Sequence, residues 1–508
     1  MSWKKLVLVQ VAICLLPLAH LGKVGAESKL WEYVTWDISP TIGSFQDIIF
    51  VDKNTIVGAK QNFNYQTRED EGWDLYLSTD AGKTWNKKLE KLPPIQKIRF
   101  FNCQIGFAIG YDYDVVVDKG TIYLGKTVDG GHTWTDLSAN LNQSGYPSNE
   151  RPYEGLYELW IIDSNTIYVA SDYQVYRSLD GGINWSQAGD ISAINPDFSI
   201  RNYPITGNLH FVNSSVGFVC SLNYLFRTND GGSSWQRLQA PWNKNEGIWA
   251  LQFLDDKNGW ALAVDYTTSF SSPGSGAFLY RTTDGGQSWS LLYKWEGDTY
   301  PKTMHVRSAT DIWLGGLGMQ EGIWHSSDGG KTWTMELEWE FDLHKIIEFQ
   351  KVGSELRAIA SNVIGTVIGS YYKYSGPSTI LPDICCNMVG GASVNNAPFS
   401  KEVTIGQADC VNIEASIKSS VTGTGDIYVV AYWQGLYLFK IGDPDQWWAW
   451  DGVTLPPYRK GVSLSGYALD IYSGLLTGLK GDLLVFVAYW KQGETKPIIS
   501  APLTIHIQ

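Results

Sequence analysis

The chain has 508 residues, a formal net charge of −13 and an aromatic content of 14%, together with 52 glycines. A chain this acidic lacks the basic surface that nucleic-acid binding requires, so no nucleic-acid partner is expected. Strands favour aromatic residues and turns favour glycine, so the composition predicts an all-β protein and excludes a disordered one.

Residues 1–26 have the pattern of a secretory signal peptide. Lys4 and Lys5 precede the apolar run 6–21, and small residues at 24–26 allow cleavage before Glu27. An uncleaved membrane anchor is the alternative, but the run is short for a bilayer span and is interrupted by polar and proline residues. We therefore expect an exported protein, periplasmic or extracellular, with no transmembrane segment in the mature chain.

One short pattern recurs six times along the next part of the chain. Each copy reads Ser/Thr-x-Asp-Gly/Ala-Gly-x-Ser/Thr/Asn-Trp, and consecutive copies begin 49, 51, 50, 54 and 44 residues apart. A period of this size is typical of four-stranded propeller blades. The Asp and Trp residues of the six boxes are Asp80 and Trp85, Asp129 and Trp134, Asp180 and Trp185, Asp230 and Trp235, Asp284 and Trp289, and Asp328 and Trp333.

A second pattern, an apolar-x-Phe strand, a polar turn and a small apolar strand, precedes each box. It occurs once more after the last box, which makes seven copies, and the seventh unit (through 366–374) has no box and no following strand. We predict that Leu30–Asp37 supplies the missing strand, because closing the ring removes open sheet edges. The expected fold is a seven-bladed β-propeller over residues 28–375, with the N-terminal strand completing the last blade.

The residue pattern of the sequence changes after the repeats. A proline- and glycine-bearing linker at 376–382 leads into residues 383–508, which contain no box. The segments 425–433 and 481–490 are both apolar and both end in Tyr-Trp, which predicts a small β-sandwich domain. The Trp-rich turn 447–450 between them allows two interpretations, a sugar-stacking or membrane-interface platform, or packing of the sandwich and its docking on the propeller.

The boxes themselves are interpreted as structural turns. An Asp at the head of a Gly-rich turn can accept backbone N–H groups, and the second glycine permits positive φ. The preceding Ser/Thr hydroxyl and the following Trp ring add a hydrogen bond and packing. Each box carries a single acid, whereas calcium loops gather several oxygen ligands, and six acids spread around a ring cannot converge on one substrate. No metal and no cofactor are expected.

Five cysteines follow the leader segment. Cys103 and Cys220 lie in apolar, strand-like runs and are interpreted as buried small hydrophobes. Cys385, Cys386 and Cys410 lie closer together, and an oxidising compartment allows one disulfide there, between Cys410 and either of the other two. No paired CxxC spacing supports a zinc site.

The six boxes resemble the Asp-box, or bacterial neuraminidase repeat, family. That family includes sialidases, xyloglucan-degrading enzymes, sortilin-type receptors and photosystem II assembly factors. The seven-unit count, the period and the export signal are most similar to the assembly-factor group, a resemblance that covers residues 28–375 and not the C-terminal region. It implies a non-enzymatic scaffold that binds a protein client. The alternative is a carbohydrate-active enzyme or glycan-binding protein of the sialidase-like class.

Candidate binding residues lie in long segments that interrupt the repeat, because function is commonly grafted onto loops of one propeller face. Aromatic and charged residues there suit an interface, and a pair such as Asp112 with Glu154 would suit a glycosidase. An enzyme should show carboxylates converging at the ring centre, whereas a scaffold should show a broad aromatic rim. The candidate rim residues are Tyr111, Asp112, Asp114, Arg151, Tyr153, Glu154, Arg201, Tyr203, Trp242 and Tyr266.

Overall fold

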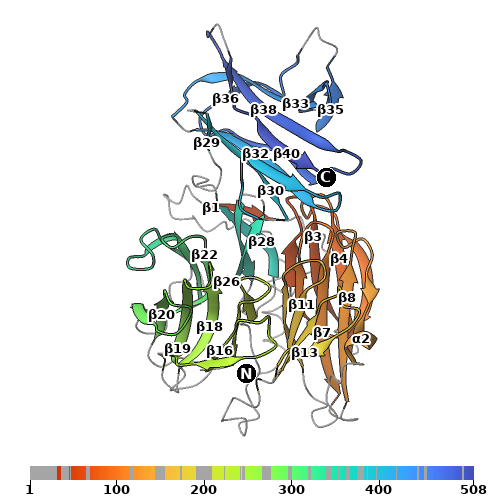
Figure 1. The fold of residues 1–508 in the computed structure, drawn as a ribbon, viewed down its shortest axis with the longest axis vertical. Coiled ribbons are helices and arrows are strands. Elements are labelled where there is room, and N and C mark those ends of the chain that lie inside the picture. Colours follow the sequence, from red (N-terminus) through yellow and green to blue (C-terminus); the bar gives the residue numbers. More distant parts are fainter. Residues whose placement is uncertain are drawn as a thin grey trace, which may run out of the picture.

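The protein is all-β in the structure, a computed structural model (Figure 1). The structure describes residues 31–35, 45, 47–64, 69–114, 119–142, 155–171, 174–189, 191, 209–221, 224–240, 242, 246–265, 276–295, 300–317, 322–338, 345–352, 355–361, 367–374, 383–385, 387–395, 397–418, 420–442, 445–450, 455–494 and 497–508. Within these residues α2 (Ser138–Asn142) is the one helix, and nothing in them is a helix long and apolar enough to cross a membrane.

Seven four-stranded antiparallel sheets make up the described chain before residue 375. Six of them pair their strands in chain order. These are β2 (Asp47–Phe50), β3 (Ile56–Asn64), β4 (Glu69–Ser78) and β5 (Asn86–Leu92); β6 (Ile95–Phe100), β7 (Gly106–Asp114), β8 (Lys119–Thr127) and β9 (Thr135–Asp136); β10 (Leu156–Ile161), β11 (Ile167–Ser171), β12 (Val175–Ser178) and β13 (Ser186–Gln187); β14 (Leu209–Phe211), β15 (Gly217–Ser221), β16 (Tyr224–Thr228) and β17 (Gln236–Leu238); β18 (Glu246–Phe253), β19 (Gly259–Asp265), β20 (Ala277–Thr282) and β21 (Ser290–Trp295); and β22 (Tyr300–Val306), β23 (Ile312–Leu317), β24 (Gly322–Ser326) and β25 (Thr334–Glu338).

The seventh sheet joins the two ends of this region. It has the order β1-β28-β27-β26, with β1 (Trp31–Thr35), β26 (Lys345–Val352), β27 (Glu355–Ser361) and β28 (Val367–Tyr374). β1 pairs antiparallel with β28, and Trp31 lies opposite Tyr374. Trp31 is buried and packs edge-to-face on Trp313, with ring centroids 5.3 Å apart. The predicted pairing of the N-terminal segment with the last repeat is confirmed.

The first strands of consecutive sheets contact one another in a closed series, which we call the inner ring. It runs β2, β6, β10, β14, β18, β22 and β26 and returns to β2. Amide side chains bond from one inner strand to the backbone of the next. Gln350 accepts the N–H of Phe50 at 3.0 Å and donates to the carbonyl of Ile48 at 2.8 Å, and Gln252 makes the same pair of bonds to Val306.

Two further sheets follow the ring (Figure 1, blue). Between them they enclose one hydrophobic core, to which Ile413 and Leu469 of the first sheet and Val429 and Val485 of the second contribute. The first has the order β29 (Asp383–Cys385), β30 (Met388–Val394), β32 (Cys410–Ile417) and β37 (Ala468–Leu475). The second has the order β31 (Glu402–Ile405), β40 (Leu503–Ile507), β38 (Gly481–Lys491), β33 (Thr424–Trp433), β34 (Leu436–Gly442) and β35 (Asp445–Ala449), with β36 (Arg459–Ser463) on β33 and β39 (Ile498–Ile499) on β38.

A disulfide joins these sheets to the ring. Cys103, in the turn between β6 and β7, bonds to Cys410 at the start of β32. The prediction that Cys410 pairs with Cys385 or Cys386 is therefore wrong, as is the interpretation of Cys103 as a buried hydrophobe. The two cysteines are 307 residues apart, and only the docking of the C-terminal sheets brings them together. Cys220 is buried with a free thiol, as expected.

An ionic cluster lies at the same junction. Lys53, in the turn after β2, forms ion pairs with Glu414 at 3.3 Å, Glu355 at 3.9 Å and Asp470. Its side chain is 18% exposed, and burial alone would lower the pKa of its amine. The three carboxylates outweigh that effect and raise the pKa of Lys53 above its ordinary value. Glu414 and Asp470 belong to the C-terminal sheets and Glu355 to the ring, so the lysine connects both parts.

Candidate functional site

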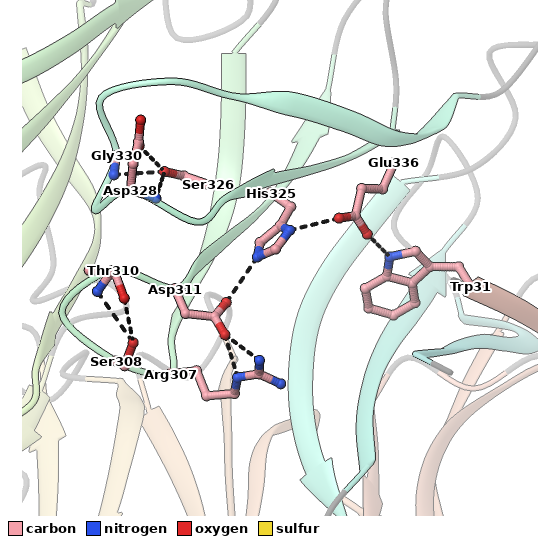
Figure 2. Close-up of polar contacts among 10 residues, drawn as sticks. All are labelled: Trp31, Arg307, Ser308, Thr310, Asp311, His325, Ser326, Asp328, Gly330 and Glu336. Atoms are coloured by element: carbon pink, nitrogen blue, oxygen red, sulfur yellow. Dashed lines mark hydrogen bonds and ion pairs between the residues drawn. The ribbon is translucent and has the colours of Figure 1, made fainter. Parts of the chain in front are cut away.

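The six boxes form one type of hydrogen-bonded turn. In the fifth, the Thr282 hydroxyl donates to Oδ1 of Asp284 at 2.8 Å, and the N–H of Gly286 donates to that hydroxyl oxygen at 2.9 Å. The N–H of Ser288 donates to Asp284 Oδ1 at 2.9 Å, and Trp289 Nε1 donates to the carbonyl of Gly286 at 3.1 Å. The other five repeat the Ser/Thr–Asp bond, and Figure 2 shows Ser326, Asp328 and Gly330 of the sixth.

The second to sixth boxes also pack against the sheet before them. Lys126, Arg177 and Arg227 donate to the carbonyl of the first glycine in the next box, at 2.8, 2.5 and 2.9 Å. The second glycine is required for two reasons. Gly286 has a φ of +86°, and a Cβ there would come within 2.9 Å of Leu238 in the preceding sheet. The boxes therefore hold consecutive sheets together.

The box carboxylates are held in their ionised form. Hydrogen bonds from the side chain and backbone of Ser288 lower the pKa of Asp284 to about 2, and those from Thr84 lower the pKa of Asp80 to about 2. A carboxylate that accepts several N–H and O–H groups has no proton to donate near neutral pH. This geometry suits a structural role for the box aspartates.

A different group of charges lies on four neighbouring strands of the inner ring. Arg99 Nη2 on β6 pairs with Glu348 Oε1 on β26 at 2.9 Å, and Lys97 Nζ on β6 pairs with Glu158 Oε1 on β10 at 2.6 Å. Asp47 on β2 accepts a backbone N–H of β6 at 3.1 Å. The side chains of Arg99 and Glu348 are 27% and 29% exposed, so solvent reaches them. We call these five residues the central cluster.

The two carboxyl groups nearest Arg99 have different environments. Burial raises the pKa of Asp47 to about 6, and the charge of Glu348 adds to the rise, while Arg99, Lys97 and the backbone N–H oppose it. Glu348 is paired directly with the guanidinium of Arg99. The cluster therefore holds one carboxyl group that keeps its proton up to about pH 6 beside a second that has a cationic partner. A proton donor next to a second carboxyl group is an arrangement that acid–base chemistry uses.

A second polar group surrounds His325 on β24 (Figure 2). Its Nδ1 lies 2.7 Å from Glu336 Oε1, its Nε2 lies 3.0 Å from Asp311 Oδ1, and its ring stacks on Trp313 at 3.8 Å. Burial by itself would lower the pKa of His325, but the hydrogen bonds and charges of Asp311 and Glu336 raise it to about 9. Because both ring nitrogens face carboxylates, the imidazole stays protonated at neutral pH and offers no free lone pair.

The His325 group has a structural consequence. The other oxygen of Glu336 accepts the indole N–H of Trp31 at 3.2 Å, so the group connects the sixth sheet to the N-terminal strand of the seventh (Figure 2). Arg307 pairs with Asp311 on its far side. In the described residues no three His, Cys, Asp or Glu side chains are arranged to hold a metal ion.

The structure describes the side chains of three of the ten predicted rim residues. Trp242 is 6% exposed and packs edge-to-face on Tyr280 and Trp289, so the expectation of an open binding residue there is corrected to a core residue. Tyr111 is half-buried against the core of its sheet, and Asp112 is exposed. The side chains of the remaining seven lie outside the described part of the chain: Asp114, Arg151, Tyr153, Glu154, Arg201, Tyr203 and Tyr266.

The central cluster was missed in the sequence, although a signal for it exists. Asp47, Lys97 and Glu158 each directly precede the apolar residue that begins a copy of the apolar-x-Phe pattern. A charged residue next to the apolar positions of a core strand is unusual, because most charged side chains stay on the surface. The alternation of sign along these three copies pointed to charges that meet across neighbouring strands.

Two family models match parts of the chain. The BNR/Asp-box repeat matches residues 76–87, and the model described as sortilin, neurotensin receptor 3, matches residues 173–298. The chain is 22% identical over 259 residues to xyloglucanase Xgh74A of Acetivibrio thermocellus, an alignment that covers 44% of this chain and 29% of the relative. The chain thus spans less than a third of the length of the curated relative it matches.

Similar solved structures have two kinds of description. YCF48 from Cyanidioschyzon merolae has a TM-score of 0.44 at 16% identity, covering 68% of this chain and 98% of that one. The GH74 xyloglucanase from Xanthomonas campestris has a TM-score of 0.40 at 11% identity, covering 90% and 72%. The chain carries Asp-box repeats, as the sequence predicted.

The sequence-based interpretation of the protein as a non-enzymatic scaffold for a protein client is wrong. The curated relative that its sequence matches is a xyloglucanase, and nothing found supports a protein client. The resemblance to assembly factors reflected the repeat architecture, which catalytic and non-catalytic Asp-box proteins share.

Proposed function

We propose that this protein acts on a glycan and hydrolyses a glycosidic bond at the central cluster. The observation that carries the proposal is the pair of carboxyl groups, Asp47 and Glu348, with Arg99 beside them. Asp47 keeps its proton up to about pH 6, so it is suited to protonate the leaving-group oxygen. Glu348 is then the second carboxylate that glycoside hydrolysis requires, as nucleophile or as base toward water.

Similarity to a xyloglucanase supports this choice of reaction class. An uncharged polysaccharide of β-linked sugars is accordingly the first substrate class to test. The rim residues Tyr111, Asp112, Asp114, Arg151, Tyr153, Glu154, Arg201, Tyr203 and Tyr266 stay a prediction, now of contacts to the glycan.

The proposal includes the architecture around the site. We infer that the seven four-stranded sheets are the blades of one propeller over residues 28–375 and that residues 383–508 form a β-sandwich after a linker at 376–382. The closed series of inner strands and the shared core of the two C-terminal sheets support this division. We also infer that residues 1–26 direct export. The Cys103–Cys410 disulfide supports export, because such bonds persist in oxidising compartments.

The test is release of reducing ends from xyloglucan and related β-glucans by the full chain. Asp47→Asn and Glu348→Gln should each lower the rate by roughly 100-fold or more, because each removes a proton-transfer or nucleophilic group while keeping the side chain's shape. Asp256→Asn, an exposed aspartate in the turn between β18 and β19 and outside the central cluster and the predicted rim, is the matched control and should keep the wild-type rate. The proposal fails if no glycan is cleaved, or if cleavage survives both central substitutions.

A further inference from the structure

The outer face of the eight-stranded C-terminal sheet is apolar along the middle of β33 and β38. On β33 and β38 the odd-numbered residues enter the shared core, and the even-numbered residues lie on the opposite face. There Tyr428 pairs with Ala488, and Val430 pairs with Phe486. A sheet with one solvated face normally alternates apolar and polar residues. Since both sets of residues are apolar here, the outer face has the composition of a binding surface.

A groove of about 420 Å³ lies on this face, a size typical of small-ligand sites. Its walls include Tyr428, Tyr437, Phe486 and Trp490, and none of the described residues that line it carries a charge. Tyr437 is 48% exposed and Trp490 is 42% exposed. Two large aromatic rings are therefore open to a ligand. Because the described lining carries no charge, ionic contacts contribute little to the binding free energy there.

The rings are held in place before any ligand arrives. Trp490 Nε1 donates to the carbonyl of Glu494 at 2.8 Å, which fixes the indole. Tyr437 lies edge-to-face against Trp450, with centroids 5.9 Å apart and planes at 88°, and 4.9 Å from the ring of Tyr432. Fixed rings lower the entropy cost of binding.

Each of the two interpretations of the Trp-rich turn holds for some of its tryptophans. Trp447 packs toward the shared core, whereas Trp448 and Trp450 are 51% and 39% exposed. Trp448 lies opposite Phe439 on β34, the strand that carries Tyr437. The exposed members of the turn therefore widen the aromatic surface beside the groove.

Charge restricts what can occupy this groove. The chain has a net charge of −13, and Asp426 lies opposite Trp490 in the β33–β38 register. An anionic membrane surface or an acidic polymer would be repelled, and a cation would meet no carboxylate among the groove's lining residues. An uncharged ligand with flat, apolar faces fits better. A β-linked glucan has this chemistry, because its pyranose rings present C–H faces and keep their hydroxyls at the edges.

We propose that the groove binds an uncharged β-linked glucan chain by stacking sugar rings on Tyr437 and Trp490. The choice of ligand rests on the proposed function, but the site is separate from the central cluster and takes no part in bond cleavage. It would hold the polysaccharide while the ring acts on it.

The test is affinity electrophoresis of the full chain in gels that contain hydroxyethyl cellulose, an uncharged soluble β-glucan. The polymer should retard the wild-type protein, and Trp490→Ala and Tyr437→Ala should each weaken binding by about tenfold or more. Retardation should persist in about 0.5 M NaCl, since no ionic contact contributes. Leu291→Ala removes a 51% exposed apolar side chain from the ring and should bind like the wild type. Thermal unfolding of each variant checks that it is folded.

Several outcomes would overturn the inference. One is that the polymer does not retard the wild-type protein, and another is that it retards both aromatic variants as much as the wild type. A third is that the aromatic residues support dimerisation or vesicle binding without glucan binding, which would assign the face to a second copy or to a lipid surface. Asp47→Asn separates the two proposals. If Asp47→Asn loses hydrolysis but is still retarded by the polymer, the glucan-binding groove is supported independently of the central cluster. If the wild type hydrolyses short substrates but is not retarded, only the central cluster is supported.

Discussion

The box turns and the central cluster place an aspartate carboxyl group in environments that shift its pKa in opposite directions. Asp284 lies in a turn where several donors converge on its carboxylate, and the pKa of the group falls to about 2. Asp47 lies among buried strands with one backbone donor and a neighbouring carboxylate, and its pKa rises to about 6. The repeated aspartate is therefore suited to structure, and the unrepeated one to chemistry.

The difference shows how little a motif says about a reaction when the motif recurs. The six boxes are the most conspicuous motif in the sequence, yet their aspartate carboxylates accept hydrogen bonds within the turn. Asp47 lies outside the boxes, and the charges that act on it, Lys97, Arg99 and Glu348, follow it in the chain by 50, 52 and 301 residues. Burial and charge, which depend on the assembled ring, decide which carboxylate can transfer a proton.

The largest expected effect is on the pH dependence of the proposed hydrolysis. A proton donor with a pKa of about 6 is active in its protonated form, so the rate should fall as pH rises through about 6. The decline should be about tenfold per pH unit, or roughly 100-fold by about pH 8. Initial rates on xyloglucan across this range measure it. A rate that rises from pH 6 to pH 8 would assign the proton donor to another group.

The second effect is on stability and concerns Asp311 and Glu336, which the protonated His325 joins. His325 has a folded-state pKa of about 9 against 6.5 unperturbed, so its stabilising contribution is full below pH 6.5 and disappears as pH rises through 9. His325→Gln should lower the free energy of unfolding by about 2–3 kcal/mol near pH 6. Chemical denaturation at several pH values measures it. A deficit that is the same near pH 6 and near pH 10 would contradict the ion-paired state.

The third effect tests the structural side of the comparison. Asp284→Ala removes the acceptor for three donors, and should cost about 2 kcal/mol of stability while hydrolysis per folded molecule stays unchanged. Because the folded-state pKa is lowered to about 2, the deficit is full above pH 3.8 and is lost as pH falls through 2. Calorimetry and the reducing-end assay together measure it. A loss of activity without a loss of stability would place the box in the reaction.

The smallest effect adjusts the central cluster without removing its acids. Arg99 lowers the pKa of Asp47, so Arg99→Gln should shift the upper limb of the pH profile to higher pH, by roughly half a unit to one unit. Arg227→Gln, which removes a cation that contacts a box instead, is the control and should leave the limb in place. An unchanged limb in Arg99→Gln would show that the guanidinium does not act on Asp47.

The sequence determined the parts of this protein that repeat. The boxes, their spacing and the orphan strand Leu30–Asp37 predicted four-stranded sheets and the pairing of β1 with β28, because turn chemistry and strand patterns are local and their period is visible. The same local logic predicted buried Cys220.

Only the tertiary structure decided what those elements bring together. Cys103 finds Cys410 because the C-terminal sheets dock on the turn after β6, and Trp242 is buried because a neighbouring blade-like sheet covers it. Asp47 meets Glu348 and Arg99 through strand order around the inner ring. Burial and the approach of distant charges are properties of that packing, and they set the pKa of a carboxyl group more strongly than its sequence neighbours do.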